Sequence, residues 1–271
     1  MEPRYAVNCS ILLTELPLLR RAQAAAEAGF DAVEFWWPWP ESVPADAEVD
    51  AFVRAIEDAG VALVGLNLAA GDMAGGDRGL VSWPGRASEL RDNVDVVVEL
   101  AKRTGCRTFN ALYGNRIDGV AAREQDELAT ENLGNAAAAV AGVGGQLVIE
   151  PLSGAPRYPL RTEADALAVV DRVAAHSGAT NLALLADLYH LAANEVDVPA
   201  VIERHTARFG HVQIADHPGR GAPGTGGLPL GTWLARIRAL GYAGWVALEY
   251  KAGPGVDPFG WLASADRGGW A

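Results

Sequence analysis

The sequence lacks the features that mark membrane, secreted and zinc-binding proteins. No run of about 18 apolar residues occurs in its 271 residues, so we expect no membrane-spanning helix and no membrane partner. Residues 1–16 contain neither a basic segment nor a continuous apolar run, which argues against a signal peptide and favours a cytoplasmic protein. The two cysteines, Cys9 and Cys106, are too few and too far apart for a disulfide framework or a zinc cluster. We expect both to serve as small apolar side chains at strand ends.

Positive charge is also scarce. The chain has 22 Lys and Arg against 34 Asp and Glu, a formal net charge of −12. Nucleic-acid-binding proteins usually carry a basic patch or stripe, so a DNA or RNA partner is not expected. The composition is otherwise that of a globular protein, with 50% hydrophobic and 21% charged residues. We expect one domain over residues 1–271.

Short runs rich in β-branched or aromatic residues alternate with segments of helical spacing. The predicted strands are residues 5–9, 32–37, 62–68, 107–112, 146–150, 182–187, 210–216 and 244–250. The predicted helices, most of which end in glycine, are residues 16–29, 46–60, 86–105, 124–145, 162–178, 198–210 and 228–241. Strand alternating with helix over eight strands predicts an α/β fold, a single (β/α)₈ TIM barrel.

A glycine-rich stretch, HVQIADHPGRGAPGTGG (211–227), contains a G-x-G-x-x-G match at Gly219, Gly221 and Gly224. A Rossmann fingerprint leads directly into a helix and is followed by further parallel strands. Here Pro223 and further loop residues precede the next predicted helix, and only one strand follows. No Lys-Ser or Lys-Thr pair follows the glycines, as it would in a P-loop. We therefore expect no nucleotide-binding loop.

Acidic or amide residues stand at the carboxyl ends of the last four predicted strands. Glu150 and Asp187 close the fifth and sixth strands, and Gln213 and Glu249 lie near the ends of the seventh and eighth. The active site of a TIM barrel lies at this end, and a carboxylate on an apolar strand is rarely buried without a partner. Each group could pair with Arg or Lys at a solvated rim. Four oxygen-bearing side chains on consecutive strands instead favour a shared hard cation, Mg²⁺ or Mn²⁺.

Further polar residues follow these strands. His190 comes three residues after Asp187 and could bind substrate oxygens, transfer protons or serve only as a structural hydrogen-bonding group. His217 and Arg220 lie in the loop after the seventh strand, where the planar fork of Arg220 suits a carboxylate substrate. The stretch EFWWPWPE (34–41) could wall the pocket or lie in the core or at a subunit contact.

Several stretches together resemble one known family. They are VNCS (7–10), NLAAGDMAGGDRGL followed by PGR (67–86), ENL (131–133), VIEPL (148–152), DLYH (187–190), GHVQIADHPGRGAPGTGG (210–227) and GWVALEYK (244–251). The chain resembles the hydroxypyruvate isomerase family, within the larger group of xylose-isomerase-like barrels that includes the ketose 3-epimerases. The resemblance covers most of the chain.

The resemblance implies a divalent-metal site formed by Glu150, Asp187, Gln213 and Glu249, with Glu150 and Glu249 also acting as acid/base groups. It implies the conversion of a small molecule, hydroxypyruvate, to tartronate semialdehyde (2-hydroxy-3-oxopropanoate). Moving the carbonyl requires a proton transfer through an enediolate that a cation can stabilise, and no organic cofactor is needed. The expected substrate-binding residues are Asn67, His190, His217 and Arg220.

Three positions depart from the family pattern. Ala222 and Gly227 stand where the family has acids in the loop after the seventh strand, and Leu66 stands where a histidine is common. The expected metal ligands are untouched. We expect Arg220 to be less restrained, the loop to be more mobile and the preferred substrate to differ from hydroxypyruvate.

Other functions stay open at this point. A 2-oxo-tetronate isomerase or a ketose 3-epimerase would use the same metal and glutamates with a larger pocket. A metal-dependent phosphodiesterase of the endonuclease type tends to hold three metals with many histidines, and the five histidines and net charge of −12 argue against it. A non-catalytic binding protein is a third alternative. The sequence also leaves open which metal is bound and whether the chain forms a homo-oligomer.

Overall fold

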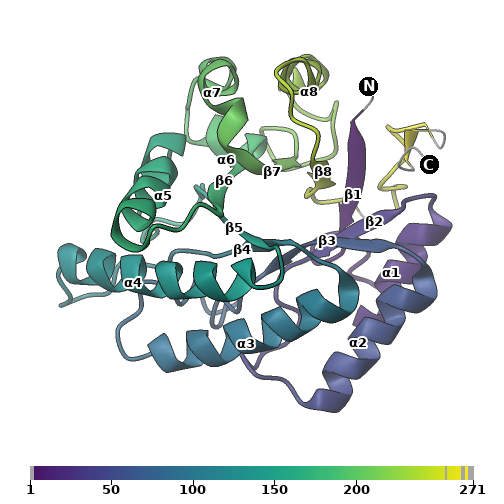
Figure 1. The fold of residues 1–271 in the computed structure, drawn as a ribbon. Coiled ribbons are helices and arrows are strands. Elements are labelled where there is room, and N and C mark those ends of the chain that lie inside the picture. Colours follow the sequence, from purple (N-terminus) through teal and green to yellow (C-terminus); the bar gives the residue numbers. More distant parts are fainter. Residues whose placement is uncertain (1–2, 254, 264–265, 268–271) are drawn as a thin grey trace.

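The chain folds into a closed barrel of eight parallel strands in sequence order, surrounded by helices (Figure 1). A computed structural model describes residues 3–253, 255–263 and 266–267. The strands are β1 (Arg4–Asn8), β2 (Ala32–Phe35), β3 (Ala62–Asn67), β4 (Thr108–Asn110), β5 (Gln146–Ile149), β6 (Leu182–Asp187), β7 (Phe209–Ile214) and β8 (Trp245–Leu248). The parallel pairing of β1 with β8 closes the ring. The predicted TIM barrel is confirmed.

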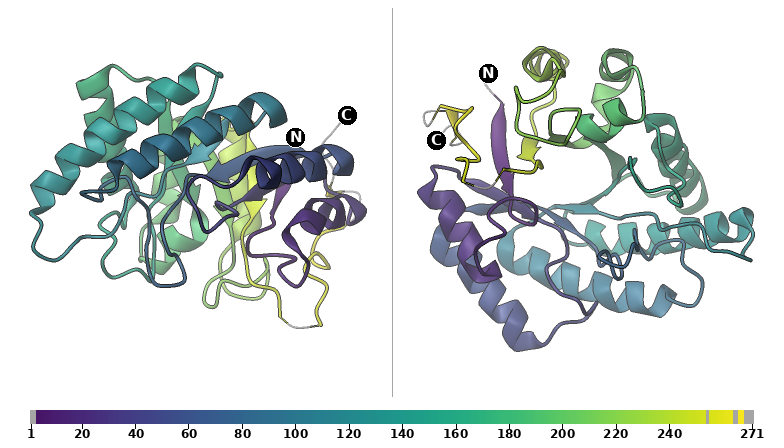
Figure 2. Two further views of the ribbon diagram at one scale, coloured as in Figure 1. Left: turned by 90° about the horizontal axis from the view of Figure 1, so that it is seen from below. Right: turned by 180° about the vertical axis from the view of Figure 1, so that it is seen from behind.

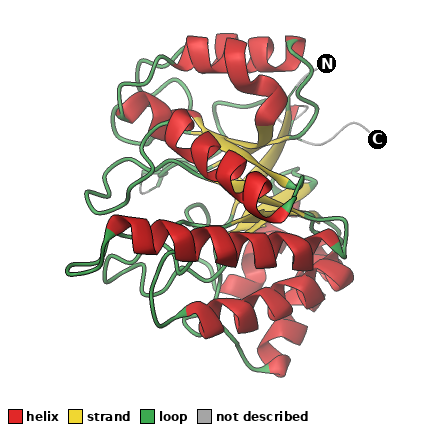
Figure 3. Ribbon diagram, turned by 60° about the vertical axis from the view of Figure 1, so that its left-hand side comes forward, coloured by secondary structure: helices red, strands yellow, loops and turns green. Residues whose placement is uncertain are grey.

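The helices form the outer layer around the strands (Figures 1 and 3). They are α1 (Leu18–Glu27), α2 (Asp46–Ala59), α3 (Ala87–Thr104), α4 (Ala122–Ala141), α5 (Glu163–Ser177), α6 (Leu188–Ala193), α7 (Val198–His205) and α8 (Leu230–Ala239), with a 3₁₀ turn η1 (Thr206–Arg208). Three of them end at glycines in the left-handed conformation, Gly60, Gly105 and Gly178. Glycine is favoured there because it has no Cβ to clash, which explains the sequence signal for helix ends.

The glycine-rich segment after β7 connects this strand to α8. Residues 215–229 form a long loop at the carboxyl end of the barrel before α8 begins. The segment after β6 differs from our prediction, because the short helix α6 follows the strand without a loop.

The described segment after β8 has no long helix. Instead, its aromatic side chains pack against the start of the chain: Trp261 lies edge-on to Tyr5 at 5.8 Å between ring centroids, and Phe259 lies 4.7 Å from Phe30. The segment lies beside β1 and α1 in both orientations (Figure 2). It therefore packs against β1 and against the chain between α1 and β2.

Both cysteines are fully buried, as predicted for small apolar side chains. Burial raises the pKa of Cys106 to about 12 and that of Cys9 further, so both remain thiols at neutral pH. No helix within the described ranges is long and apolar enough to span a membrane.

Candidate active site

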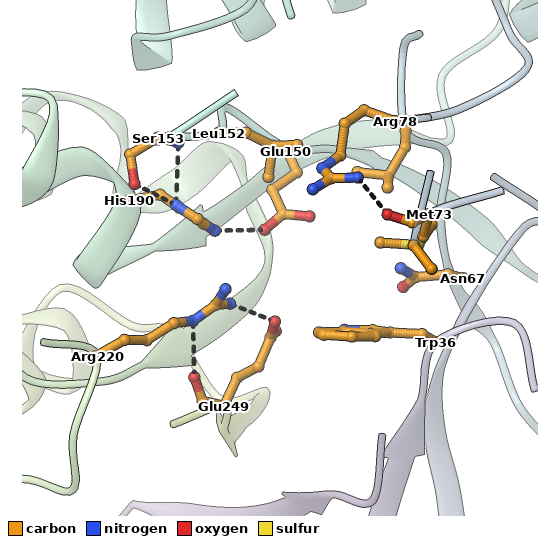
Figure 4. Close-up of a pocket in the computed structure, with 13 residues that line it drawn as sticks. Trp36, Asn67, Met73, Arg78, Glu150, Leu152, Ser153, His190, Arg220 and Glu249 are labelled. Carbon is orange, nitrogen blue, oxygen red and sulfur yellow. Dashed lines mark hydrogen bonds and ion pairs between the residues drawn. The ribbon is translucent and has the colours of Figure 1, made fainter. Parts of the chain in front are cut away.

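A cavity of about 400 Å³ opens at the carboxyl end of the barrel (Figure 4). Strand ends and the loops that follow them supply its lining. The lining residues are Trp36, Asn67, Met73, Ala74, Arg78, Leu112, Glu150, Leu152, Ser153, Gly154, His190, Arg220 and Glu249. This is the end at which TIM-barrel enzymes build their active sites.

The predicted metal ligands come from four consecutive strands. Glu150 and Glu249 directly follow β5 and β8, Asp187 is the last residue of β6, and Gln213 lies in β7. All four are buried, with 1–4% of each residue exposed. Asp187 and Gln213 are also Cα partners across the β6–β7 pair, so their side chains start from neighbouring points. The four residues are therefore buried and do not lie at a solvated rim; Glu150 and Glu249 line the cavity, whereas Asp187 and Gln213 lie outside its lining.

Several oxygen atoms in this group have no hydrogen-bond partner within the described part of the chain. They are Oδ2 of Asp187, Oε1 of Gln213 and Oε2 of Glu249, each buried. A buried acceptor without a partner is costly, and a cation is a partner that carboxylate and amide oxygens can share. An all-oxygen set suits a hard divalent ion such as Mg²⁺ or Mn²⁺. These residues fit the divalent cation that the sequence led us to expect.

The carboxylate of Asp187 has two separate roles. Its Oδ1 accepts hydrogen bonds from the backbone N–H groups of Tyr189 (2.8 Å) and His190 (3.3 Å), which caps the start of α6. This contact fixes the rotamer and leaves Oδ2 free to face the site.

Arg220 supplies a positive charge inside the site. Its Nη2 lies 2.5 Å from Oε1 of Glu249 and 3.6 Å from Oδ2 of Asp187. Its backbone has φ of 58°, a left-handed conformation that disfavours residues other than glycine, Asn or Asp. The side chain, rather than the local backbone, accounts for an arginine at this position.

The environment raises the pKa of both glutamates. Burial, together with the nearby charge of Asp187, raises the pKa of Glu150 to about 8. Burial also raises the pKa of Glu249 well above its ordinary value, while Arg220 acts in the opposite direction. A positive charge placed among these carboxylates would lower both values. Carboxyl groups whose pKa is moved toward neutrality can both accept and donate protons.

His190 is held as a neutral hydrogen-bond donor. Its Nδ1 accepts the backbone N–H of Ser153 at 3.0 Å, so the ring proton is on Nε2. Burial lowers the pKa of His190 to about 4; Asp187 opposes this shift, whereas Arg220 and Arg78 reinforce it. Nε2 faces the site, 3.6 Å from Oδ2 of Asp187 and 3.9 Å from Oε1 of Glu150.

Glu150, Asp187 and His190 bring potential ligand atoms within 4.8 Å of one another. A metal ligand must offer a lone pair, and the lone pair of Nδ1 is already used by Ser153 while Nε2 carries the proton. His190 is therefore better suited to donate a hydrogen bond to a substrate oxygen than to bind the cation. Asn67 and Arg220 join it in the cavity lining.

His217 is not brought into the cavity. It lies outside the lining residues, and its ring centroid is 5.8 Å from that of Tyr189. Leu66 is buried in the core and also lies outside the lining, so the departure at this position does not shape the cavity wall directly.

The loop after β7 is held by one buried carboxylate. Asp216 accepts backbone N–H groups of His217 (2.9 Å), Gly224 (2.8 Å) and Leu228 (2.9 Å). Burial raises the pKa of Asp216, but these hydrogen bonds outweigh it and the net pKa is lowered. Arg220 has other restraints in the absence of the loop acids: Glu249 holds its side chain and Lys251 N–H donates to its backbone carbonyl. That Arg220 is less restrained than in relatives with the loop acids stays a prediction.

Three residues of the site were not singled out from the sequence. Asn110 donates from Nδ2 to Oε2 of Glu150 at 2.6 Å. Arg78 lines the cavity opposite the loop after β7, and Glu34 lies buried beneath the site. The signal for Glu34 was present, because a charged residue between Val33 and Phe35 interrupts an apolar strand.

Comparison with known proteins agrees with the observed fold. A family model described as xylose isomerase-like TIM barrel matches residues 22–267. A Streptomyces coelicolor protein provisionally named hydroxypyruvate isomerase is 54% identical over 272 residues, covering 98% of each chain. A 2-oxo-tetronate isomerase of Cupriavidus necator is 36% identical over 265 residues, covering 96% of this chain and 97% of the relative.

A solved structure from Brucella melitensis, titled AP endonuclease, family 2, superposes with a TM-score of 0.86. It is 34% identical and the match covers 96% of this chain and 98% of the other. The similarity therefore spans the whole barrel and its loops. The two curated relatives carry isomerase names, in agreement with the predicted class of enzyme.

Proposed function

We propose that this chain, which belongs to the xylose isomerase-like TIM barrel family, isomerises a small hydroxy-oxo acid. The first candidate substrate is hydroxypyruvate, which would be converted to tartronate semialdehyde; the name of the Streptomyces coelicolor relative supports it. The second candidate is the four-carbon 2-oxo-tetronate, which the name of the Cupriavidus necator relative supports. A cavity of about 400 Å³ has room for this larger acid. Either substrate places one carboxylate beside a hydroxy-ketone.

The proposal of an acidic substrate rests on the contacts of one cation in the cavity, Arg78. Its Nη1 donates only to backbone carbonyls, those of Met73 (3.0 Å) and Asp77 (2.6 Å), and it forms no ion pair with a carboxylate of the described chain. Its charge also contributes to the lowered pKa of His190. Arg220, in contrast, is already neutralised by Glu249 and Asp187. Arg78 is therefore the cavity-lining cation that is free to bind a substrate carboxylate.

The two glutamates suit the proton transfer. Isomerisation removes a proton from the carbon that carries the hydroxyl and adds one to the neighbouring carbonyl carbon, while the hydroxyl proton moves to the former carbonyl oxygen. Glu150 and Glu249 point into the same space from opposite walls (Figure 4). One carboxylate can remove the proton and the other can deliver one. The Nε2–H of His190 can donate to the oxygen on which negative charge develops.

A divalent cation completes this proposal. Glu150, Asp187, Gln213 and Glu249 would hold it, and it would stabilise negative charge that develops on neighbouring substrate oxygens. No organic cofactor enters the reaction. Arg220 keeps Glu249 oriented and lowers its pKa, so that the carboxylate is available as a base.

The test compares an acid with a neutral sugar. Metal-loaded enzyme is assayed with hydroxypyruvate, 2-oxo-tetronate and D-fructose, and the assays are repeated with Arg78→Met. The variant should raise KM for the preferred acid by about 10- to 100-fold, the value of one charge-assisted contact, and leave any neutral substrate unaffected. Arg123→Met, which removes an exposed arginine outside the cavity, is the matched control. Preference for D-fructose in the parent enzyme would instead identify a ketose isomerase or epimerase.

Two functions of other classes make different predictions. A phosphodiesterase of the endonuclease type would need several metals, yet His190 is the one histidine in the cavity lining among the five of the chain. Cleavage of abasic-site DNA by the metal-loaded protein would support that function. A binding protein would take up small acids and turn none of them over.

A further inference from the structure

A buried carboxylate outside the predicted ligand set lies inside the barrel beneath the cavity. Glu34, on β2, is only 3% exposed. Its Oε1 accepts from Nδ2 of Asn8 (2.8 Å) and Nε2 of Gln213 (2.9 Å), and its Oε2 accepts from Nε2 of His211 (2.6 Å). Three donors from β1 and β7 therefore satisfy one carboxylate, which explains how it can be buried without an arginine or lysine.

The bond to Gln213 decides which way that amide points. The two ends of a glutamine amide have almost the same shape, and hydrogen-bond partners decide which end occupies which place. An ionised carboxylate can only accept, so it selects the NH₂ end. The carbonyl end of Gln213, Oε1, is then left on the other side, where it is buried and has no partner within the described chain.

We propose that Glu34 is a positioning residue for the cation site, which acts by fixing the Gln213 amide with its oxygen toward the cation. This inference rests on the proposed function, because Gln213 is a ligand only if the site holds a cation. Outer residues that orient metal ligands commonly contribute 10- to 100-fold to metal affinity, about the effect expected here.

Gly65 supports the same arrangement. It faces Glu34 across the β2–β3 pair, and a Cβ at this position would lie 2.9 Å from Oε2 and 3.1 Å from Cβ of Glu34. Its backbone is not left-handed, so an alanine is compatible with the main chain. Gly65→Ala would therefore displace the Glu34 side chain without changing any charge or polar group.

The experiment measures Mn²⁺ affinity of metal-free protein by calorimetry, with no turnover involved. Glu34→Asp keeps the charge but withdraws the carboxylate by one methylene, and Gly65→Ala keeps both charge and carboxylate. We expect each to weaken Mn²⁺ binding by about 10-fold or more. Glu163→Asp, which shortens a buried glutamate at the start of α5 by the same methylene, is the matched control and should keep the parent affinity. Circular dichroism and thermal melting verify folding.

A double-mutant cycle tests whether Glu34 acts through Gln213. In a Gln213→Met background, which has already lost the ligand oxygen, Glu34→Asp should cause no further loss of affinity. Additive losses would overturn the inference. The inference would also be overturned if Glu34→Asp and Gly65→Ala both bound Mn²⁺ as tightly as the parent protein. If one variant does not fold, the Mn²⁺ affinity of the other decides. If the parent protein itself binds no Mn²⁺, the proposed function fails; if the parent binds Mn²⁺ and the variants match it, only the positioning role fails.

Discussion

Nη2 of Arg220 lies 2.5 Å from Oε1 of Glu249, inside the group of predicted metal ligands. The guanidinium also reaches toward Asp187, at 3.6 Å. A fixed positive charge at this point offsets part of the unfavourable burial of two carboxylates. Arg220 thus lies among the predicted metal ligands as well as in the cavity lining, and its role in substrate binding stays a prediction.

Removal of the Arg220 charge should change the pH dependence of the reaction. Arg220 lowers the pKa of Glu249 against the effect of burial, so Arg220→Gln should let this pKa rise further. Because the base must be ionised, the acid limb of the kcat/KM profile should move to higher pH, and the rate at pH 7 should fall by about 100-fold. Arg220→Lys keeps the charge and should shift the limb less. An unchanged profile in Arg220→Gln would show that Glu249 is not the base.

Neutralising the proposed base should abolish turnover without unfolding the protein. Glu249→Gln keeps the shape of the side chain and removes the proton acceptor, so kcat should fall by about 10²- to 10⁴-fold. The protein should stay folded with a lower melting temperature, because the buried guanidinium of Arg220 loses its closest carboxylate partner. Rate measurements and melting curves for the same sample check both statements. Near-parent kcat would exclude Glu249 as an acid/base group.

Chelation should inactivate the enzyme reversibly. The unpartnered oxygens of Asp187, Gln213 and Glu249 form an all-oxygen set, so activity lost after EDTA dialysis should return with Mg²⁺ or Mn²⁺. Elemental analysis of the dialysed protein is the necessary control. Full activity in a sample shown to hold no metal would contradict the cation mechanism.

Asp216 should make the loop after β7 sensitive to acid. Its pKa is lower in the folded protein than in the unfolded chain, so its contribution to stability is complete above the unfolded pKa of about 4 and is lost as pH falls through the folded value. Asp216→Asn should therefore lower the free energy of unfolding by about 2 kcal/mol at pH 7, with a smaller difference below pH ~4. Urea unfolding from pH 3 to pH 7 measures this, with the exposed Asp118→Asn as control. A difference that stays constant with pH would rule out the carboxylate as its source.

The fold was readable from the sequence because most strands and helices carry their own signal. Buried strands such as β6 are continuous apolar runs that end on a predicted site residue, and helices such as α3 end at a glycine in the left-handed conformation that glycine favours. The short helix α6 has no separate starting signal: its N-terminal cap is the side chain of Asp187, which accepts two N–H groups and is also one of the predicted metal ligands.

The site was readable only where strand order alone brings residues together. Glu150 and Asp187 end adjacent strands, so their proximity follows from the barrel. Arg78 is different: its position depends on a contact between loops, in which the backbone N–H of Gly114 donates to its carbonyl at 2.9 Å. Glu34 is different again, because its partners come from β1 and β7 and their distance depends on how the ring closes. Contacts of this kind have no local sequence signature.

The contact between β2 and β7 through Glu34 also bears on the order in which the barrel can form. Glu34 belongs to the second strand, and two of its three donors, His211 and Gln213, belong to the seventh. A partial sheet that lacks β7 would have to keep this carboxylate hydrated, because burial without those donors is costly. We therefore expect the Glu34 carboxylate to lose its water only once β7 has joined the sheet. A fragment without β7 would lack both the closed ring and the Gln213 amide that Glu34 contacts.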